Sequence, residues 1–321
     1  MDHQHGALYC TVKRAESSHA RAGVLRVDGT EVQTPILWLG HRLGGKPRPW
    51  QAFSLPGVLV NAWQVLSMRR VPRQASPYRV QECRDLMTSS PVLIDSGGYL
   101  YLKREDFRPD PLEILQLYED LNPAIGAVLD CPLDPFLAPE QNEMRWRRTL
   151  ANTRAMYQKN GHLTLMPVVH AHSIDQAKRG CDELREVVGE PIALGIGSLV
   201  PLMRGRHDGR VLAKQAGAGS EADGDYQSSR HLAVDIIRTV RAEFPNALLH
   251  VFGVGGTTTM HLMFAQGIDS LDSVGWRLKA AHGAIQLPGL GDRFISTRAH
   301  NTRALLAEDG NAKEVTVQGV R

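Results

Sequence analysis

The chain has 321 residues, of which 42 % are hydrophobic and 22 % are charged, and its formal net charge is +3. This composition is typical of an ordinary globular protein, and the mild positive charge permits a nucleic-acid partner without requiring one. Because no apolar run approaches the roughly 20 residues that span a bilayer, we expect no contact with a membrane. The first ten residues, MDHQHGALYC, lack the basic and apolar regions of a signal peptide, so we expect a cytoplasmic protein.

The first predicted elements are two strands, LYCTVKR (8–14) and GVLRVDGTEV (23–32), which form a short antiparallel hairpin. Eight short and nearly continuous apolar runs follow, as expected of strands that are covered on both faces. They span residues 35–40, 57–63, 91–95, 126–130, 163–169, 191–197, 247–253 and 269–274. Amphipathic segments between them predict helices, with Asp110 and Ser173 as N-cap residues of two of them. These segments span residues 111–121, 143–160, 173–188 and 230–244.

Strands that alternate with helices indicate parallel βαβ units, and eight such strands fit a closed (β/α)8 barrel, or TIM barrel, of about 250 residues. We therefore predict one α/β barrel domain over residues 1–300. A segment rich in glycine, serine and charge at 205–229 predicts a flexible insertion loop, and residues 301–321 form a polar tail. A doubly wound open sheet is the alternative, and the lack of a G-x-G-x-x-G motif that opens a first helix weakens it.

In a barrel of this kind, the active site lies where the strands end and the loops to the helices begin. Three aspartates occupy such positions, namely Asp95, Asp130 and Asp272. Turn propensity accounts for any one of them, because aspartate often ends a strand. Three carboxylates at one barrel mouth indicate chemistry that separates their pKa values, such as glycosyl transfer or glycoside hydrolysis, or else a magnesium site.

Several motifs that carry or neighbour these aspartates resemble the tRNA-guanine transglycosylases, and their wording is closer to the archaeal branch than to the bacterial one. The resemblance runs in the right order from about residue 8 to residue 295. The motifs are DSGGY (95–99), LDCPLDP (129–135), GIGSLVPL (195–202) and FGVGG followed by GIDSLDSV (252–256 and 267–274).

This resemblance implies base exchange, in which guanine within a polynucleotide is replaced by a 7-deazaguanine base such as preQ0, without ATP at that step. Asp272 would be the nucleophile that attacks C1′ and gives a covalent intermediate. Asp95 would be the acid and base that handles the proton of the leaving and incoming bases. Asp130 would accept hydrogen bonds from the Watson–Crick edge of the base.

Further residues of the base pocket follow from the same resemblance. Tyr99 and Phe252 match the two positions whose aromatic rings sandwich the base, where stacking contributes about 1–3 kcal/mol per base. A glutamine contact of the bacterial enzymes is replaced by His170 or His172, unless these are structural histidines. The other residues assigned to the pocket are Ser96, Gly197, Ser198 and Leu199.

The chain departs from the family where a zinc site is usual. Family members carry a C-x-C-x-x-C…H cluster after the nucleophile strand, whereas no cysteine of this chain follows Cys181. The cysteines are far apart and form no C-x-x-C pair, so we expect free thiols, no structural zinc and no other cofactor.

The zinc subdomain and a neighbouring loop help family members to bind tRNA, so these departures weaken a tRNA assignment. Arg277 and Lys279 remain after Asp272 as candidates for nucleic-acid contact. We therefore favour DNA as the polynucleotide, as in the related DNA 7-deazaguanine transglycosylases. The alternatives are the same exchange on tRNA, as in queuosine- or archaeosine-type modification, a non-catalytic binding subunit, and an unrelated barrel chemistry. An ATPase partner protein and a homodimer are left open.

Overall fold

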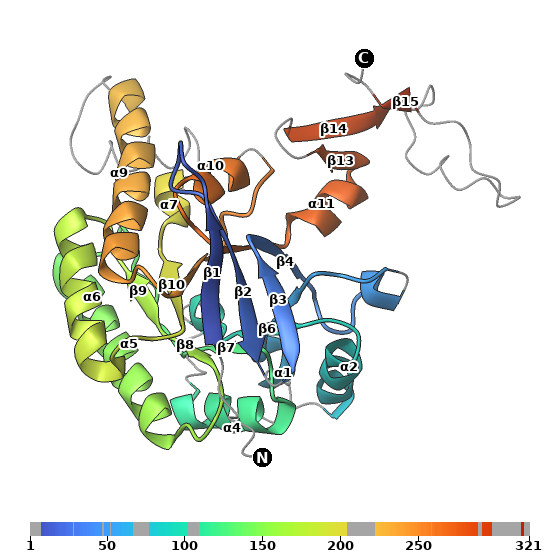
Figure 1. Ribbon diagram of the computed structural model, residues 1–321, viewed down its shortest axis with the longest axis horizontal. Helices are drawn as coiled ribbons and strands as arrows, with labels where there is room; N and C mark the ends of the chain where they lie inside the picture. Colours follow the sequence, from blue (N-terminus) through green and yellow to red (C-terminus); the bar gives the residue numbers. More distant parts are fainter. Residues whose placement is uncertain are drawn as a thin grey trace, which may run out of the picture.

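The computed structural model describes residues 8–27, 29–46, 48–51, 53–66, 77–101, 109–203, 222–257, 259–287, 291–296 and 316–317. Its centre is a sheet of nine short strands, all of which pair in parallel (Figure 1). In chain order the strands are β4 (Ile36–Gly40), β5 (Val58–Asn61), β6 (Val92–Asp95), β7 (Ile125–Ala127), β8 (Leu165–Met166), β9 (Val168–His170), β10 (Ala193–Gly197), β11 (Leu248–Val251) and β12 (Ser270–Ser273).

The sheet closes on itself at Pro167. Strand β8 pairs with β7, and β9 pairs with β10, although only Pro167 separates β8 from β9 in the chain. Proline has no N–H to donate to a ladder, which divides the run predicted as one strand at 163–169. The Pro167 carbonyl still accepts a hydrogen bond from the Gly195 N–H at 2.8 Å. Residues 165–170 therefore pair with β7 on one side and with β10 on the other. Eight strand positions therefore form a ring, and the predicted (β/α)8 barrel is confirmed.

Helices follow most of the strands and lie along the outside of the barrel in Figure 1. Asp110 caps α4 by accepting a hydrogen bond from the Leu112 N–H at 2.9 Å, and Ser173 caps α6 through the Gln176 N–H at 3.1 Å, as predicted. None of the described helices combines the length and the apolar composition that crossing a membrane requires. The helices are α1 (Ala62–Leu66), α2 (Pro77–Met87), α3 (Gly98–Tyr101), α4 (Pro111–Leu121), α5 (Pro139–Lys159), α6 (Ile174–Val188), α7 (Val200–Met203), α9 (Ala222–Glu243), α10 (Met260–Ala265) and α11 (Gly275–Ala281).

Helix α9 begins at Ala222, inside the range that the sequence predicted as an insertion loop. The part of that predicted loop at 205–221 lies outside the described residues, as does most of the predicted tail at 301–321. Two residues of the tail, β15 (Thr316–Val317), pair with β14 (Gly291–Ser296), which pairs with β13 (Ala284–Leu287). This small antiparallel sheet follows α11 and was not predicted.

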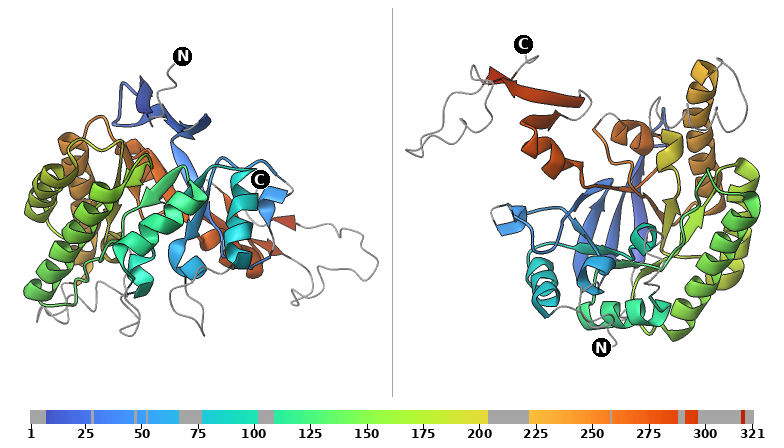
Figure 2. Two further views of the ribbon diagram at one scale, coloured as in Figure 1. Left: turned by 90° about the horizontal axis from the view of Figure 1, so that it is seen from below. Right: turned by 180° about the vertical axis from the view of Figure 1, so that it is seen from behind.

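A second antiparallel sheet covers the N-terminal end of the barrel (Figure 2, left). It contains β1 (Leu8–Arg14), β2 (Arg21–Val27) and β3 (Thr30–Thr34), because the predicted second strand turns back at Gly29, whose φ is +79°. Arg21 fixes this sheet to the barrel, since its guanidinium contacts Asp269 at 2.7 Å and the Ala247 carbonyl at 2.6 Å. With this end covered, the C-terminal ends of the strands are the open mouth of the barrel.

Candidate active site

The three aspartates singled out by the sequence lie at this mouth. Asp95 is the last residue of β6, Asp272 is the third residue of β12, and Asp130 follows the end of β7. Asp130 and Asp272 are mostly enclosed, with side-chain exposures of 11 % and 12 %. The charges of Asp130 and Asp272 both act on Asp95, so the closed barrel brings the three carboxylates together.

Asp95 is the carboxyl group whose protonation the site controls. Burial, and then the negative charges of Asp130 and Asp272, raise its pKa from 3.8 to about 7. Two hydrogen bonds partly oppose this rise, one from the Asn61 side-chain amide and one from the Gly97 N–H at 3.3 Å. Asn61 stands beside Asp95 because β5 and β6 end in register. A carboxyl group with this pKa can both give and take a proton near neutral pH.

Asp130 is held by groups from two neighbouring loops and strands. The Ser96 hydroxyl donates to its Oδ1 at 3.1 Å, and His170 Nε2 lies 3.1 Å from its Oδ2. The backbone of Gly98 passes so close that a Cβ atom there would lie 2.4 Å from the Asp130 carbonyl oxygen. Glycine is therefore required at position 98, which gives the second glycine of the DSGGY motif a structural reason.

The other ring nitrogen of His170, Nδ1, also has a partner. Its Nδ1 lies 3.0 Å from the Ser198 hydroxyl, which accepts a hydrogen bond from the Leu133 N–H at 2.8 Å. Ser198 has a φ of +63°, an uncommon conformation for a residue with a side chain and one that clusters at functional sites. Gly197 leaves room for the imidazole, since a Cβ atom there would lie 2.4 Å from His170 Cε1. Of the two candidate histidines, His170 is thus the one that contacts a carboxylate.

Asp272 is buried and is positioned by the loop after β11. Its Oδ1 accepts a hydrogen bond from the Gly253 N–H at 2.7 Å, and its backbone carbonyl accepts one from the Gly255 N–H at 3.1 Å. His250 Nε2 lies 3.4 Å from the same Oδ1. The backbone N–H groups of the FGVGG motif therefore hold the predicted nucleophile through two hydrogen bonds.

The two aromatic residues predicted to sandwich a base occupy different surroundings. Phe252 is half-buried, packs edge-on against His250 with ring centroids 4.4 Å apart, and covers Gly195. Tyr99 lies on α3 at the rim and is 58 % exposed. Leu199 is fully buried, backbone included, so it lies behind the surface of the mouth.

The predicted nucleic-acid contacts, Arg277 and Lys279, lie on α11 immediately after β12. Arg277 donates to the Lys46 carbonyl, and its guanidinium carbon lies 5.7 Å from the centroid of the Trp276 ring. Trp276 Nε1 donates to the Gly40 carbonyl at 3.0 Å. These contacts fix the start of α11 against the end of β4 and the loop that follows it, which keeps Arg277 near the mouth.

Two groups at the mouth have no role predicted from the sequence. Asn61 is only a polar residue at a predicted strand end, and His250 lies within a predicted apolar strand. The signal for His250 is nevertheless present, since it is the one polar side chain in the run ALLHVFG. Its contact with Asp272 depends on the pairing of β11 with β12, which local sequence patterns do not specify.

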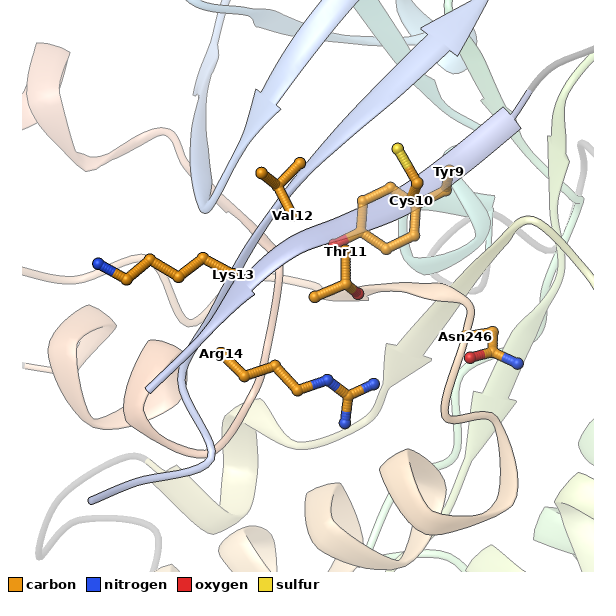
Figure 3. Close-up of a pocket in the computed structure, with 7 residues that line it drawn as sticks. All are labelled: Tyr9, Cys10, Thr11, Val12, Lys13, Arg14 and Asn246. Atoms are coloured by element: carbon orange, nitrogen blue, oxygen red, sulfur yellow. The ribbon is translucent and has the colours of Figure 1, made fainter. Parts of the chain in front are cut away.

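A cavity of about 450 Å³ lies elsewhere, along β1 of the N-terminal sheet (Figure 3). None of the three carboxylates contributes to its lining, so it is separate from the candidate site. The residues that line it are Tyr9, Cys10, Thr11, Val12, Lys13, Arg14 and Asn246.

The relatives that match the chain include the tRNA-guanine(15) transglycosylases of several archaea, although no family model matches it. The tRNA-guanine(15) transglycosylase of Methanobrevibacter smithii is 23 % identical over 291 residues, which are 89 % of this chain and 39 % of that protein. The protein of the same name from Archaeoglobus fulgidus is 25 % identical over 232 residues, or 71 % of this chain and 42 % of that one. The chain thus spans about two fifths of the length of these curated relatives. By sequence the chain is thus similar to archaeal tRNA-guanine transglycosylases, the resemblance that its motifs predicted.

Proposed function

We propose that this chain exchanges a guanine base within a polynucleotide for a 7-deazaguanine base through a covalent intermediate on Asp272. The observation that carries the proposal is the group of three carboxylates, in which burial and the charges of Asp130 and Asp272 raise the pKa of Asp95 to about 7. This arrangement sets a carboxylate nucleophile beside an acid whose pKa lies near neutral, and cleavage of a glycosidic bond requires both groups. The similarity to the archaeal enzymes supports the same chemistry.

In the first half of the reaction, an Asp272 oxygen bonds to C1′ while the bond from C1′ to N9 of guanine breaks. The electron pair of that bond goes to the guanine ring, and Asp95 donates its proton to the leaving base. In the second half, Asp95 accepts a proton from the incoming base, whose N9 attacks C1′ and releases Asp272. Protons and charges balance over the two halves, so the cycle consumes no further reactant.

Asp130 selects the base. Its carboxylate oxygens accept hydrogen bonds from the N1–H and exocyclic amino group of a guanine-like ring, a donor-rich edge that adenine lacks. Ser96 and His170 keep the carboxylate in one orientation, and the close approach of Gly98 keeps its backbone in place. Phe252 and Tyr99 contribute aromatic faces, one half-buried and one at the rim. The target nucleotide has to be flipped out to reach this pocket.

The names of the archaeal relatives favour tRNA over DNA as the polynucleotide substrate. The departures in the zinc region favour DNA, but the archaeal relatives are named as tRNA enzymes. We therefore propose tRNA as the substrate, with DNA as the alternative that the experiment must separate. Arg277, which donates to the Lys46 carbonyl, and Lys279 on the same helix α11 are the cations that we assign to phosphate contacts.

The test is incorporation of radiolabelled guanine by the purified chain into tRNA and, in a parallel reaction, into single- and double-stranded DNA. We expect label in tRNA and none with the Asp272→Ala variant, which keeps the fold but lacks the nucleophile. Label in DNA alone would restore the DNA assignment. Label in neither pool would contradict an autonomous transglycosylase and favour a binding subunit that needs a partner.

A further inference from the structure

His250 lies at the end of a buried series of polar groups that starts away from the site. Trp38 on β4, Ser270 on β12 and His250 on β11 are all fully buried. The Trp38 indole Nε1 lies 2.7 Å from the Ser270 hydroxyl oxygen, which lies 2.8 Å from His250 Nδ1. The imidazole then presents Nε2 to Asp272 Oδ1 at 3.4 Å. Three adjacent strands of the barrel therefore connect a core tryptophan to the predicted nucleophile.

The chemistry of these groups fixes the direction of the hydrogen bonds. An indole N–H can only donate, so the Ser270 oxygen accepts from Trp38. The Ser270 hydroxyl is fully buried, so its own proton needs a hydrogen-bond acceptor, and His250 Nδ1 is the acceptor beside it. In the neutral imidazole that accepts this proton at Nδ1, Nε2 carries the N–H. The tautomer of His250 is thus set by a tryptophan on a nearby strand.

The Nε2–H of His250 is buried and forms no aligned hydrogen bond within the described residues, and it faces the Asp272 carboxylate. A buried donor without a partner is unfavourable, and catalytic hydrogen bonds are often long until substrate is bound. The two atoms are already 3.4 Å apart, so a small rotation of the imidazole or of the carboxylate would align the N–H with Asp272 Oδ1. The Gly253 N–H already donates to the same oxygen at 2.7 Å.

We propose that His250 is a positioning residue for Asp272, an inference that rests on the proposed base exchange. Its Nε2–H and the Gly253 N–H together hold Oδ1, and Oδ2 is then the oxygen that attacks C1′. The Trp38–Ser270 pair acts through His250 by keeping the imidazole in the tautomer that donates. Removal of the Nε2 donor slows formation of the covalent intermediate without weakening selection of the base.

His170 provides an internal comparison because it repeats the arrangement at the other carboxylate. Its Nδ1 contacts a serine hydroxyl at 3.0 Å, and its Nε2 contacts Asp130 at 3.1 Å. Ser198 accepts from the Leu133 N–H, just as Ser270 accepts from Trp38. Equivalent substitutions at 170 and 250 therefore remove the same type of contact from two carboxylates with different roles.

The decisive variants are His250→Gln and His250→Asn. The glutamine amide nitrogen reaches the place of Nε2 and can still donate to Asp272, whereas the asparagine amide reaches only the Ser270 side. With unmodified tRNA as the probe and no free base, we expect His250→Asn to form the covalent adduct about 10- to 100-fold more slowly than the unaltered chain. This is the scale for loss of one hydrogen bond to a charged group. His250→Gln should recover most of that rate, and His170→Asn should instead raise the KM for free base.

Thermal unfolding of both variants separates positioning from a structural role, since a structural role predicts rates that follow stability. Equal adduct rates for the unaltered chain and His250→Asn, or equal losses in the Gln and Asn variants, would overturn the assignment. The ¹⁵N NMR shifts of His250 in the full chain provide a test without substrate, and a proton on Nδ1 would also overturn it. If the unaltered chain forms no adduct with tRNA or with DNA, the proposed function fails and the role of His250 fails with it.

Discussion

Replacement of Asp95 by asparagine tests the electrostatics of the site through protein stability. Burial and the charges of Asp130 and Asp272 raise the pKa of Asp95 from 3.8 to about 7. Because the folded-state pKa lies above the unfolded value, the native state binds this proton more tightly. The stability that the group contributes is fully present below about pH 4 and is lost as the pH rises through about 7. At 1.36 kcal/mol per pKa unit, the loss is on the order of 4 kcal/mol.

The Asp95→Asn variant cannot ionise at this position, so it avoids that loss. We expect its unfolding free energy, relative to the unaltered protein, to increase by about 4 kcal/mol between pH 4 and pH 8. Base exchange should be abolished in the same variant. Urea unfolding at five pH values measures the difference, and Asp120→Asn, at an exposed position on α4, is the matched control. Parallel stability curves for Asp95→Asn and the unaltered protein would refute the clustering of the three carboxylates.

Three further substitutions test the base pocket. Asp130→Asn should weaken binding of the free base by about 1–3 kcal/mol, measured as the KM for labelled guanine, because the base edge loses its acceptor; an unchanged KM would count against selection by Asp130. Gly98→Ala places a Cβ atom 2.4 Å from the Asp130 carbonyl oxygen, so it should cost about 1–3 kcal/mol in urea unfolding and most of the exchange rate. Gly161→Ala, where a Cβ atom meets nothing within 4 Å, is its control, and equal effects of the two would contradict the close approach. Phe252→Ala should raise the KM for base by the equivalent of about 1–3 kcal/mol, and an effect on kcat alone would argue against stacking.

Local sequence signals predicted most of the barrel because they act over a few residues. Helix α4 has the predicted bounds, since Asp110 forms a capping box with Glu113 and Pro111 suits the first turn. Where long-range pairing decides, the prediction was incomplete. Pro167 divides one apolar run between two neighbouring strands, and β15 at 316–317 pairs with β14 at 291–296, which lies well before it in the chain. The local sequence of each strand does not show which strand it pairs with.

The same distinction applies to the site. Strand ends are visible in sequence, so the local pattern alone places Asp95 and Asp272 at one barrel mouth. The shift in the pKa of Asp95 is not visible in that way, because it depends on burial and on two charges from other strands. His250 was missed because a polar residue inside a strand has no evident partner until β11 and β12 are paired. The sequence thus predicted that the aspartates lie at one mouth, and the structure adds the side chains and backbone N–H groups that contact them.

The most direct test of the account is the location of the covalent adduct. The purified chain is incubated with tRNA and, separately, with DNA, without free base; each reaction is quenched by denaturation, and the adduct is mapped by proteolysis and mass spectrometry. The account predicts a nucleotide attached to the peptide that contains Asp272, through its carboxylate. An adduct on Asp95 or on any other residue, or base exchange that proceeds without an adduct, would contradict it.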